Sequence, residues 1–177
     1  SKSIPHKNVA LVGGKPLIYY SIQSAKNSKL LDAFIVSTDD EKIAKVAKSF
    51  GADVPFLRPT EFSGDKALDI SFMQHALKWL EENRGWKPNI VLNLRPTGPL
   101  RTAKDIDDVI TIMKKTGCDS VRTVSDFEQH NPFKMWYLNK GGEKMRPVLP
   151  TKLYKKVGTD VPRQQLPKVY WQNGLID

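Results

Sequence analysis

Hydrophobic positions along this chain repeat with two alternating periods. Four stretches carry apolar residues at the spacing of an amphipathic helix: residues 16–28, 40–50, 65–83 and 103–116. Next to them lie four short apolar runs with the length of a buried strand: residues 33–37, 53–57, 89–94 and 119–124. We expect Asp39 or Asp40 to cap the second helix, and Gly51 and Gly117 to follow the ends of the second and fourth.

This alternation predicts an α/β fold in which helical crossovers join parallel strands, giving a mostly parallel sheet with helices on both faces. The pattern changes after Ser125. Residues 131–167 contain five prolines and a Gly141-Gly142 turn, which predicts a hairpin or an extended arm. Residues 169–176 are expected to form a late strand that returns to the sheet. We therefore expect one domain over residues 1–177, with the arm at about 131–167.

Both ends of the chain are expected to lie inside a longer protein. Ser1 to Asn8 form a loop-like segment where an α/β protein would have its first strand, and no initiator methionine precedes them. Ile176 and Asp177 fall inside a stretch with strand character.

Charge narrows the range of ligands. The chain has 28 Lys and Arg against 19 Asp and Glu, a net charge of +9, which fits nucleic acid or an anionic small molecule such as a nucleotide or a sugar acid. The positive residues are dispersed. Lys42, Lys45 and Lys48 repeat at helical spacing, and Lys114 and Lys115 close another helix. Because no basic stripe is interleaved with aromatic residues, nucleic acid is the less favoured partner.

Hydropathy and cysteine content indicate the cellular compartment in which the protein is expected to work. No apolar run approaches the ~18 residues of a membrane span, and no signal-like apolar segment follows the first residues. The single cysteine, Cys118, excludes an internal disulfide and is interpreted as a small core residue. These features favour a cytoplasmic protein that does not bind a membrane.

The strongest candidate site is the turn from Leu94 to Arg101, LRPTGPLR, at the end of the run 89–94. Two prolines, Pro96 and Pro99, stiffen it by fixing their own φ and restricting the residue before each. Ligands of open α/β sheets bind at the carboxyl ends of strands, and arginine forks suit anions. The same pattern fits an ordinary loop with surface arginines, and the local sequence leaves both interpretations open.

Four further segments carry residues suited to binding or catalysis. They are the loop 1–8 with Lys2 and Lys7, the acidic segment 37–40, the turn 130–134 that ends in Lys134, and the segment 163–174 with Arg163 and Asn173. Lysines on a loop over a sheet suit phosphates, and Arg and Asn donate to carboxylates and hydroxyls. The acidic pair is interpreted as a helix cap in preference to a metal or ribose site. The sequence shows no metal-ligand spacing of histidines and no Ser/His/Asp or Cys/His set.

In this order, the segments resemble the motifs of the acylneuraminate cytidylyltransferase family, the CMP-sialic acid synthetases and their relatives. The loop 1–8 resembles the second half of the family's phosphate loop, and residues 36–40 with 51–59 resemble the segment that follows. The turn 94–101 matches the signature turn, and residues 130–134 and 163–174 match the sugar-side motifs. The resemblance spans essentially the whole chain. It implies a Rossmann-like nucleotidyltransferase fold and a homodimer built by the arm.

The resemblance also implies a reaction, the joining of CMP from CTP to a nine-carbon 2-keto sugar acid with release of pyrophosphate. The nucleotide side would comprise Ser1, Lys2, Lys7, Asn8, Arg58, Asp69 and Thr97, with Lys2 and Lys7 as the catalytic residues on the phosphates. The sugar side would comprise Arg95, Lys134, Arg163 and Asn173. Mg²⁺ would be the cofactor. Its ligands are unknown in this chain, because the family's acidic metal motif is expected beyond Asp177.

The chain departs from the family pattern at two site positions, one beside the sugar at Arg95 and one near the base at Asp69. The sialic acid enzymes commonly carry Gln-Pro-Thr-Ser where this chain has Arg-Pro-Thr-Gly at 95–98, and Asp69 stands where the family often has a small hydroxyl residue. Arg95 places a fixed cation beside the sugar site, so a legionaminic-type bacterial sugar is at least as favoured as N-acetylneuraminate. The alternative from another class is a non-catalytic nucleotide- or sugar-acid-binding module of the same fold.

Overall fold

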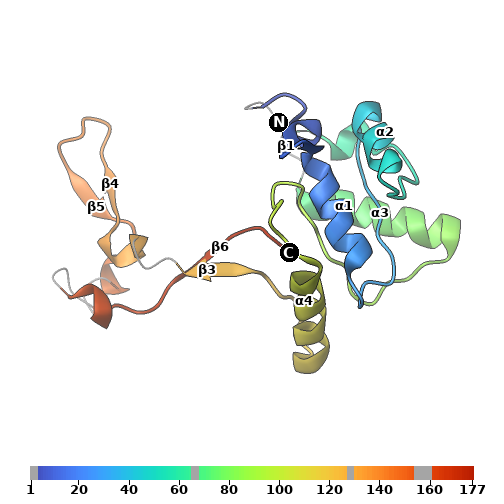
Figure 1. Cartoon of the computed structure of the whole chain (residues 1–177). Helices are drawn as coiled ribbons and strands as arrows, with labels where there is room; N and C mark the ends of the chain where they lie inside the picture. The colour runs from blue at the N-terminus through green and yellow to red at the C-terminus, as the bar shows by residue number, and fades with distance from the viewer. Residues whose placement is uncertain (1–3, 65–67, 127–129, 154–160) are drawn as a thin grey trace. The chain divides into compact units, whose positions relative to one another are not determined.

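A computed structural model describes residues 4–64, 68–126, 130–153 and 161–177 (Figure 1). The chain forms two compact units, one of residues 1–122 with 174–177 and one of residues 123–173. The predicted arm, at about 131–167, falls within the second unit. Among the described residues, no helix is both long and apolar enough to cross a bilayer.

The first unit contains the four predicted helices: α1 Leu17–Asn27, α2 Glu41–Ser49, α3 Asp69–Arg84 and α4 Ala103–Thr116. Asp40 is the residue that caps α2, because its carboxylate accepts hydrogen bonds from the backbone N–H groups of Lys42 and Ile43. A capping box of Thr102 and Asp105 begins α4. Gly117 ends α4 at a φ of 65°, a left-handed conformation that favours glycine. Local capping signals therefore predicted these helix ends well.

The segments on either side of α2 lie side by side in parallel. Ile35 pairs with Asp53, and Thr38 pairs with Leu57. A 2.8 Å hydrogen bond joins the Val36 N–H to the Asp53 carbonyl. Helix α2 is thus the crossover of a parallel βαβ unit, as the sequence predicted for this part of the chain.

The run 89–94 pairs differently from the prediction. Asn93 and Asp177 exchange two backbone hydrogen bonds, of 2.7 and 3.4 Å, which is the pattern of an antiparallel pair. The sequence predicted a late strand over residues 169–176 that returns to the sheet; the pairing with Asn93 is made by Asp177, beyond that range, and it runs antiparallel. The regular strands of this unit among the described residues, β1 Leu11–Val12 and β2 Lys15–Pro16, also pair antiparallel. A wider parallel sheet with helices on both faces stays a prediction.

Two apolar clusters hold the first unit together. The first joins α1 and α2 to the parallel pair and has as its buried members Ile18, Ile22, Ala44, Ala47, Ala52 and Val54. The second packs α4 against the run 89–94 and the end of the chain, with Ile106, Val109, Ile110 and Ile176 buried. The apolar periodicity of α1, α2 and α4 thus corresponds to the faces that these helices bury.

The second unit contains the predicted hairpin. Strand β4 Trp136–Leu138 pairs antiparallel with β5 Met145–Pro147 (Figure 1). Strand β3 Val124–Asp126 pairs antiparallel with β6 Tyr170–Gln172. The strand predicted at 119–124 therefore begins later, at Val124, because its hydrogen-bond partner is the distant β6 and not a neighbour in sequence.

Candidate functional site

The buried side chain of Arg101 stabilises the turn 94–101 through hydrogen bonds. Its side chain is only 3% exposed. The guanidinium donates hydrogen bonds to the carbonyl of Leu175, to the carbonyl of Arg95 at 3.2 Å, and to Ser21 Oγ on α1 at 2.6 Å. Burial lowers the pKa of Arg101 to about 10, so the side chain stays charged at neutral pH. The interpretation of both arginines of this turn as anion-binding forks is therefore wrong for Arg101. Its guanidinium is instead a structural clamp, a buried donor that joins the carbonyls of Leu175 and Arg95.

Arg95, in contrast, is half-exposed and lies in an ion-pair cluster. Its Nη2 contacts Asp69 at the start of α3, and its Nε lies 3.2 Å from Asp177 Oδ2. The side chains of Arg95 and Asp69 are 46% and 49% exposed, whereas that of Asp177 is 15% exposed. The structure thus brings together Asp69 and Arg95, which the resemblance assigned to different ligands, and adds Asp177.

The remaining turn residues fit closely against the returning chain end. A Cβ on Gly98 would lie 3.0 Å from Leu175 Cδ1, which is tighter than ordinary contact. The preceding residue, Thr97, is exposed. Gly98 is therefore the residue that lets the turn approach the segment 174–177.

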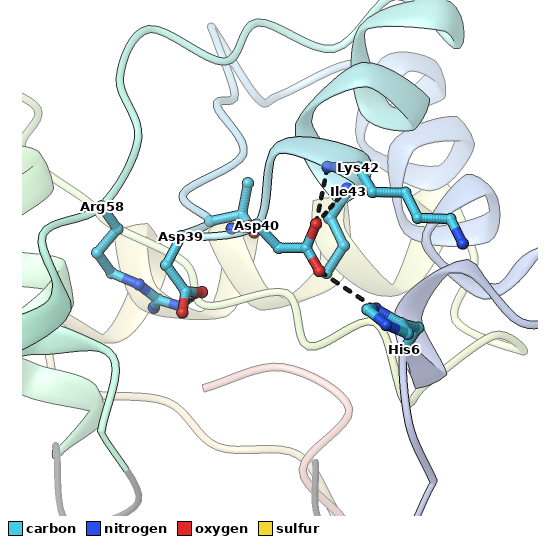
Figure 2. A network of polar contacts seen from close by, with 7 residues as sticks. His6, Asp39, Asp40, Lys42, Ile43 and Arg58 are labelled. Carbon is cyan, nitrogen blue, oxygen red and sulfur yellow. Dashed lines mark hydrogen bonds and ion pairs between the residues drawn. The ribbon is translucent and has the colours of Figure 1, made fainter.

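The N-terminal loop is tethered to the start of α2. Lys7 and Asn8 lie in a single turn of 3-10 helix, η1 Lys7–Val9, and His6 before it has a φ of 49°. Figure 2 shows the His6 ring facing Asp40, with Nδ1 3.3 Å from Asp40 Oδ2. The side chains of Lys7 and Asn8 are partly exposed. Ser1 and Lys2, the other predicted phosphate ligands, lie outside the described residues.

The carboxylate of Asp40 makes both the contact with His6 and the N-terminal cap of α2. Partial burial raises its pKa, but hydrogen bonds from the backbone N–H groups of Ile43 and Lys42 and the contact with His6 outweigh burial, so the pKa lies below its ordinary value. The interpretation of this acidic pair as a helix cap is confirmed for Asp40.

Arg58 extends from the parallel pair toward the other member of that acidic pair. Its Nη2 lies 3.4 Å from Asp39 Oδ1, and its guanidinium lies 4.9 Å from the centroid of the Phe72 ring (Figure 2 shows Arg58 and Asp39). Its Nε is buried and makes no hydrogen bond with the described residues. Arg58, Asp39 and His6 with Asp40 thus line the carboxyl end of the strand segment 35–38.

The second unit carries the other predicted sugar-side residues. Lys134 ends the short helix η4 Pro132–Lys134 and is exposed, and Arg163 begins the short helix η5 Arg163–Gln165. The Asn173 amide is engaged within this unit: its Oδ1 accepts from Thr123 Oγ1 at 2.7 Å, and its Nδ2 donates to Ser125 Oγ at 3.0 Å. Asn173 therefore braces the end of the β3–β6 pair.

Sequence reasoning assigned no role to His6 or to Asp177. His6 stands beside Lys7 in the loop that the sequence singled out, but a lone histidine carries no pairing signal. Asp177 acts through contacts with residues far away in the sequence. Among the described residues, no group of three or more His, Cys, Asp or Glu side chains could hold a metal ion.

Comparison with known proteins places these elements in a family. The family model described as "Cytidylyltransferase" matches residues 1–140. The chain is 31% identical over 177 residues to the post-translational flagellin modification protein B of Campylobacter coli, covering 99% of this chain and 71% of that protein.

Two further relatives are named for their chemistry. The pseudaminic acid cytidylyltransferase of Campylobacter jejuni is 44% identical over 81 residues, which are 46% of this chain and 35% of that protein. The CMP-N,N′-diacetyllegionaminic acid synthase of Legionella pneumophila is 37% identical over 125 residues, which are 71% of this chain and 53% of that protein. The matches thus span 71% of the Campylobacter coli relative and about half or less of the other two.

A solved structure supports the fold. The CMP:2-keto-3-deoxy-manno-octonic acid synthetase complexed with CTP aligns with 77% of this chain and 54% of that chain, with a TM-score of 0.58 and 16% identity. At this identity the likeness concerns the fold alone. It confirms the expected nucleotidyltransferase fold in its coarse form, a mixture of helices and strands.

Proposed function

The chain belongs to the cytidylyltransferase family, and from this premise we propose that the protein joins CMP from CTP to a nine-carbon 2-keto sugar acid. The sugar would be a nonulosonate of the sialic, legionaminic or pseudaminic type. The observation that carries the proposal is the family match over residues 1–140, which includes the loop with Lys7, the parallel pair with Arg58 and the turn 94–101. The names of the relatives supply the substrate class.

The reaction requires two anions to meet. The anomeric hydroxyl of the sugar attacks the α-phosphorus of CTP and loses its proton, a P–O bond to the sugar forms, and the bond to the β-phosphate oxygen breaks as pyrophosphate leaves. Lys2 and Lys7 would hold the phosphates and stabilise the negative charge that develops there. Arg95 would lie beside the sugar, and Lys134, Arg163 and Asn173 would contact it in the assembled protein.

Mg²⁺ is the metal proposed for this chemistry, because divalent ions neutralise transferring phosphates. The described residues do not fit such an ion on their own, since no three potential ligands gather there. No step of the reaction is therefore assigned to the metal in this part of the chain.

A homodimer built by the arm is also proposed. The hairpin exposes several large apolar side chains, among them Tyr137 at 62%, Leu138 at 64% and Met145 at 62%. Exposed apolar surface of this kind marks interaction sites. Light scattering of the full-length protein at several concentrations would test this assembly state directly.

The experiment for the function measures pyrophosphate release from CTP with a panel of nonulosonates, using the full-length protein. We expect release with at least one sugar, and Lys7→Ala to lower the rate by ~100-fold or more, as at other sites that stabilise anionic charge. Lys45→Ala, an exposed lysine on α2, is the matched control and should keep the parent rate. Clear CTP binding without release for any sugar would instead support the non-catalytic binding module.

A further inference from the structure

The backbone of His6 has a conformation that is unusual for its residue type. Its φ of 49° and ψ of 31° lie in the left-handed region. Within the described part of the chain, His6 is the one residue other than glycine that has a positive φ. A side chain with a Cβ makes this conformation unfavourable, so it persists where surrounding contacts hold it. The next residues along the chain are Lys7 and Asn8, and the backbone of His6 therefore sets the direction in which this part of the loop runs.

The side chain of His6 makes one contact that can hold this conformation. Asp40 caps α2 with Oδ1, which accepts from the backbone N–H groups of Lys42 at 2.7 Å and Ile43 at 3.2 Å. The other oxygen, Oδ2, lies 3.3 Å from His6 Nδ1, as Figure 2 shows. The pKa of Asp40 lies below its ordinary value, so the carboxylate is ionised at neutral pH and can only accept; His6 Nδ1 therefore carries the proton and donates. The cap and the contact with His6 thus use different oxygens of one carboxylate.

Asp40 is a firm anchor for this contact, because it is also held from the strand side. Its backbone N–H donates to Thr38 Oγ1 at 3.2 Å, and Thr38 is only 5% exposed. The carbonyl of Thr38 in turn accepts from the backbone N–H of Arg58 at 2.8 Å. These contacts join the loop, through Asp40 and Thr38, to the segment that carries Arg58. The two described basic residues that the resemblance assigned to the nucleotide, Lys7 and Arg58, therefore belong to connected segments.

We propose that His6 is a positioning residue for the nucleotide: its contact with Asp40 holds the backbone of the loop so that Lys7 meets the phosphates of CTP. This inference rests on the proposed function and deepens it, because it assigns a role to a residue that acts through its neighbour. Without the contact, CTP has to order this part of the loop when it binds, and that ordering costs conformational entropy. The loss therefore falls on the affinity for CTP. The rate with saturating CTP changes little, because the bound phosphates then hold the loop.

Three variants of the full-length protein separate the contact from the backbone conformation and from the helix cap. His6→Gly accepts the positive φ but has no side chain. His6→Asn also tolerates the left-handed region, and its Nδ2 is a donor bonded to Cγ, as Nδ1 of histidine is. Asp40→Ser keeps a good N-cap residue for α2 but lacks the second oxygen, the one that faces His6.

The measurements are the Kd for CTP by calorimetric titration, and kcat and KM for CTP from pyrophosphate release. His6→Gly and Asp40→Ser should each weaken CTP binding by about 5–30-fold, the equivalent of fixing the backbone of one residue. Their kcat should stay within about 3-fold of the parent, as for a loss confined to binding. His6→Asn should keep the Kd within about 3-fold of the parent, because the donor is restored. The double variant of His6→Gly and Asp40→Ser should bind CTP no more weakly than the poorer single variant, because both changes remove one contact.

Glu41→Gln is the matched control, because Glu41 is the exposed first residue of α2, next to Asp40. It removes one negative charge at the same place but leaves the contact with His6 intact, so CTP binding should be unchanged or slightly tighter.

Three results would each overturn the inference while leaving the proposed function standing: unchanged CTP affinity in His6→Gly, tighter binding in Asp40→Ser, or a His6→Asn protein that binds CTP as weakly as His6→Gly. A parent protein that binds CTP but releases no pyrophosphate with any nonulosonate would overturn the proposed function, and the titrations would still decide the role of His6. A parent protein that does not bind CTP would overturn both.

Discussion

Replacing Arg101 by methionine tests whether a buried clamp supports the turn 94–101. Methionine keeps much of the length and apolar bulk of the side chain but removes all five N–H donors. The carbonyls of Leu175 and Arg95 and the hydroxyl of Ser21 would lose their donors together. We expect Arg101→Met to destabilise the first unit.

The magnitude follows from two opposing effects. A hydrogen bond from a charged group contributes about 1.5–3 kcal/mol, and acceptors left unpaired in the interior cost more than exposed ones. Against this, methionine removes the burial of a charge, a cost that the lowered pKa of about 10 reports. We therefore expect a net loss of about 2–4 kcal/mol in the free energy of unfolding, below the sum of the three hydrogen bonds.

The pH dependence of this group has a definite sign. The folded pKa lies below the ordinary value of an arginine, so the unfolded state binds the proton more tightly. The free-energy cost of burying the charge is therefore present at all pH values below about 10 and is relieved as pH rises above that value toward the ordinary pKa of arginine. Arg101→Met lacks this relief, and its deficit relative to the parent should grow above pH 10.

Urea unfolding followed by tryptophan fluorescence, with m-values compared, is the assay. Arg84→Met serves as the control, because Arg84 forms its ion pair at the surface and its loss should change stability far less. A free energy of unfolding for Arg101→Met within about 0.5 kcal/mol of the parent would refute the role of Arg101 as a buried clamp, since that is the range of ordinary surface substitutions.

Two further substitutions test the cap and the turn. Asp40→Ala should lower stability by about 1 kcal/mol at neutral pH, because α2 loses two hydrogen bonds to its N-terminus. The Asp40 pKa is lowered in the folded protein, so its stabilisation is present above the ordinary pKa of 3.8 and disappears as pH falls through the folded value; thermal unfolding of variant and parent should converge there. Gly98→Ser should cost about 1–3 kcal/mol, because a Cβ would lie 3.0 Å from Leu175 Cδ1. Leu175→Ala should recover part of this loss in urea unfolding, and an additive double variant would contradict the contact.

Elements with local signals were predictable from the sequence. The capping box at Thr102 and the glycine at 117 define both ends of α4, and the period of apolar residues gives its buried face. The parallel pair around α2 followed from a short strand, a helix and a short strand in succession. In each case the information lies within one stretch of the chain.

Pairing between distant segments was not predictable in this way. Nothing in the run 89–94 indicates that Asn93 pairs with the last residue, Asp177, or that the direction is antiparallel. The second unit gives the same result, because the start of β3 is set by its partner β6. Apolar alternation reports which face is buried, but it does not identify the neighbouring strand.

Arg95 and Arg101 show the same limit at the level of a single turn. Both are arginines in the turn that follows the run 89–94, and the local sequence predicts the same role for both. Their difference comes from the segment 174–177: the Leu175 carbonyl accepts a hydrogen bond from Arg101, and Asp177 forms an ion pair with Arg95. One returning segment therefore buries the first arginine as a clamp and leaves the second at the surface with a counter-charge. Removal of this segment should affect both arginines at once, because each has a contact with the same four residues.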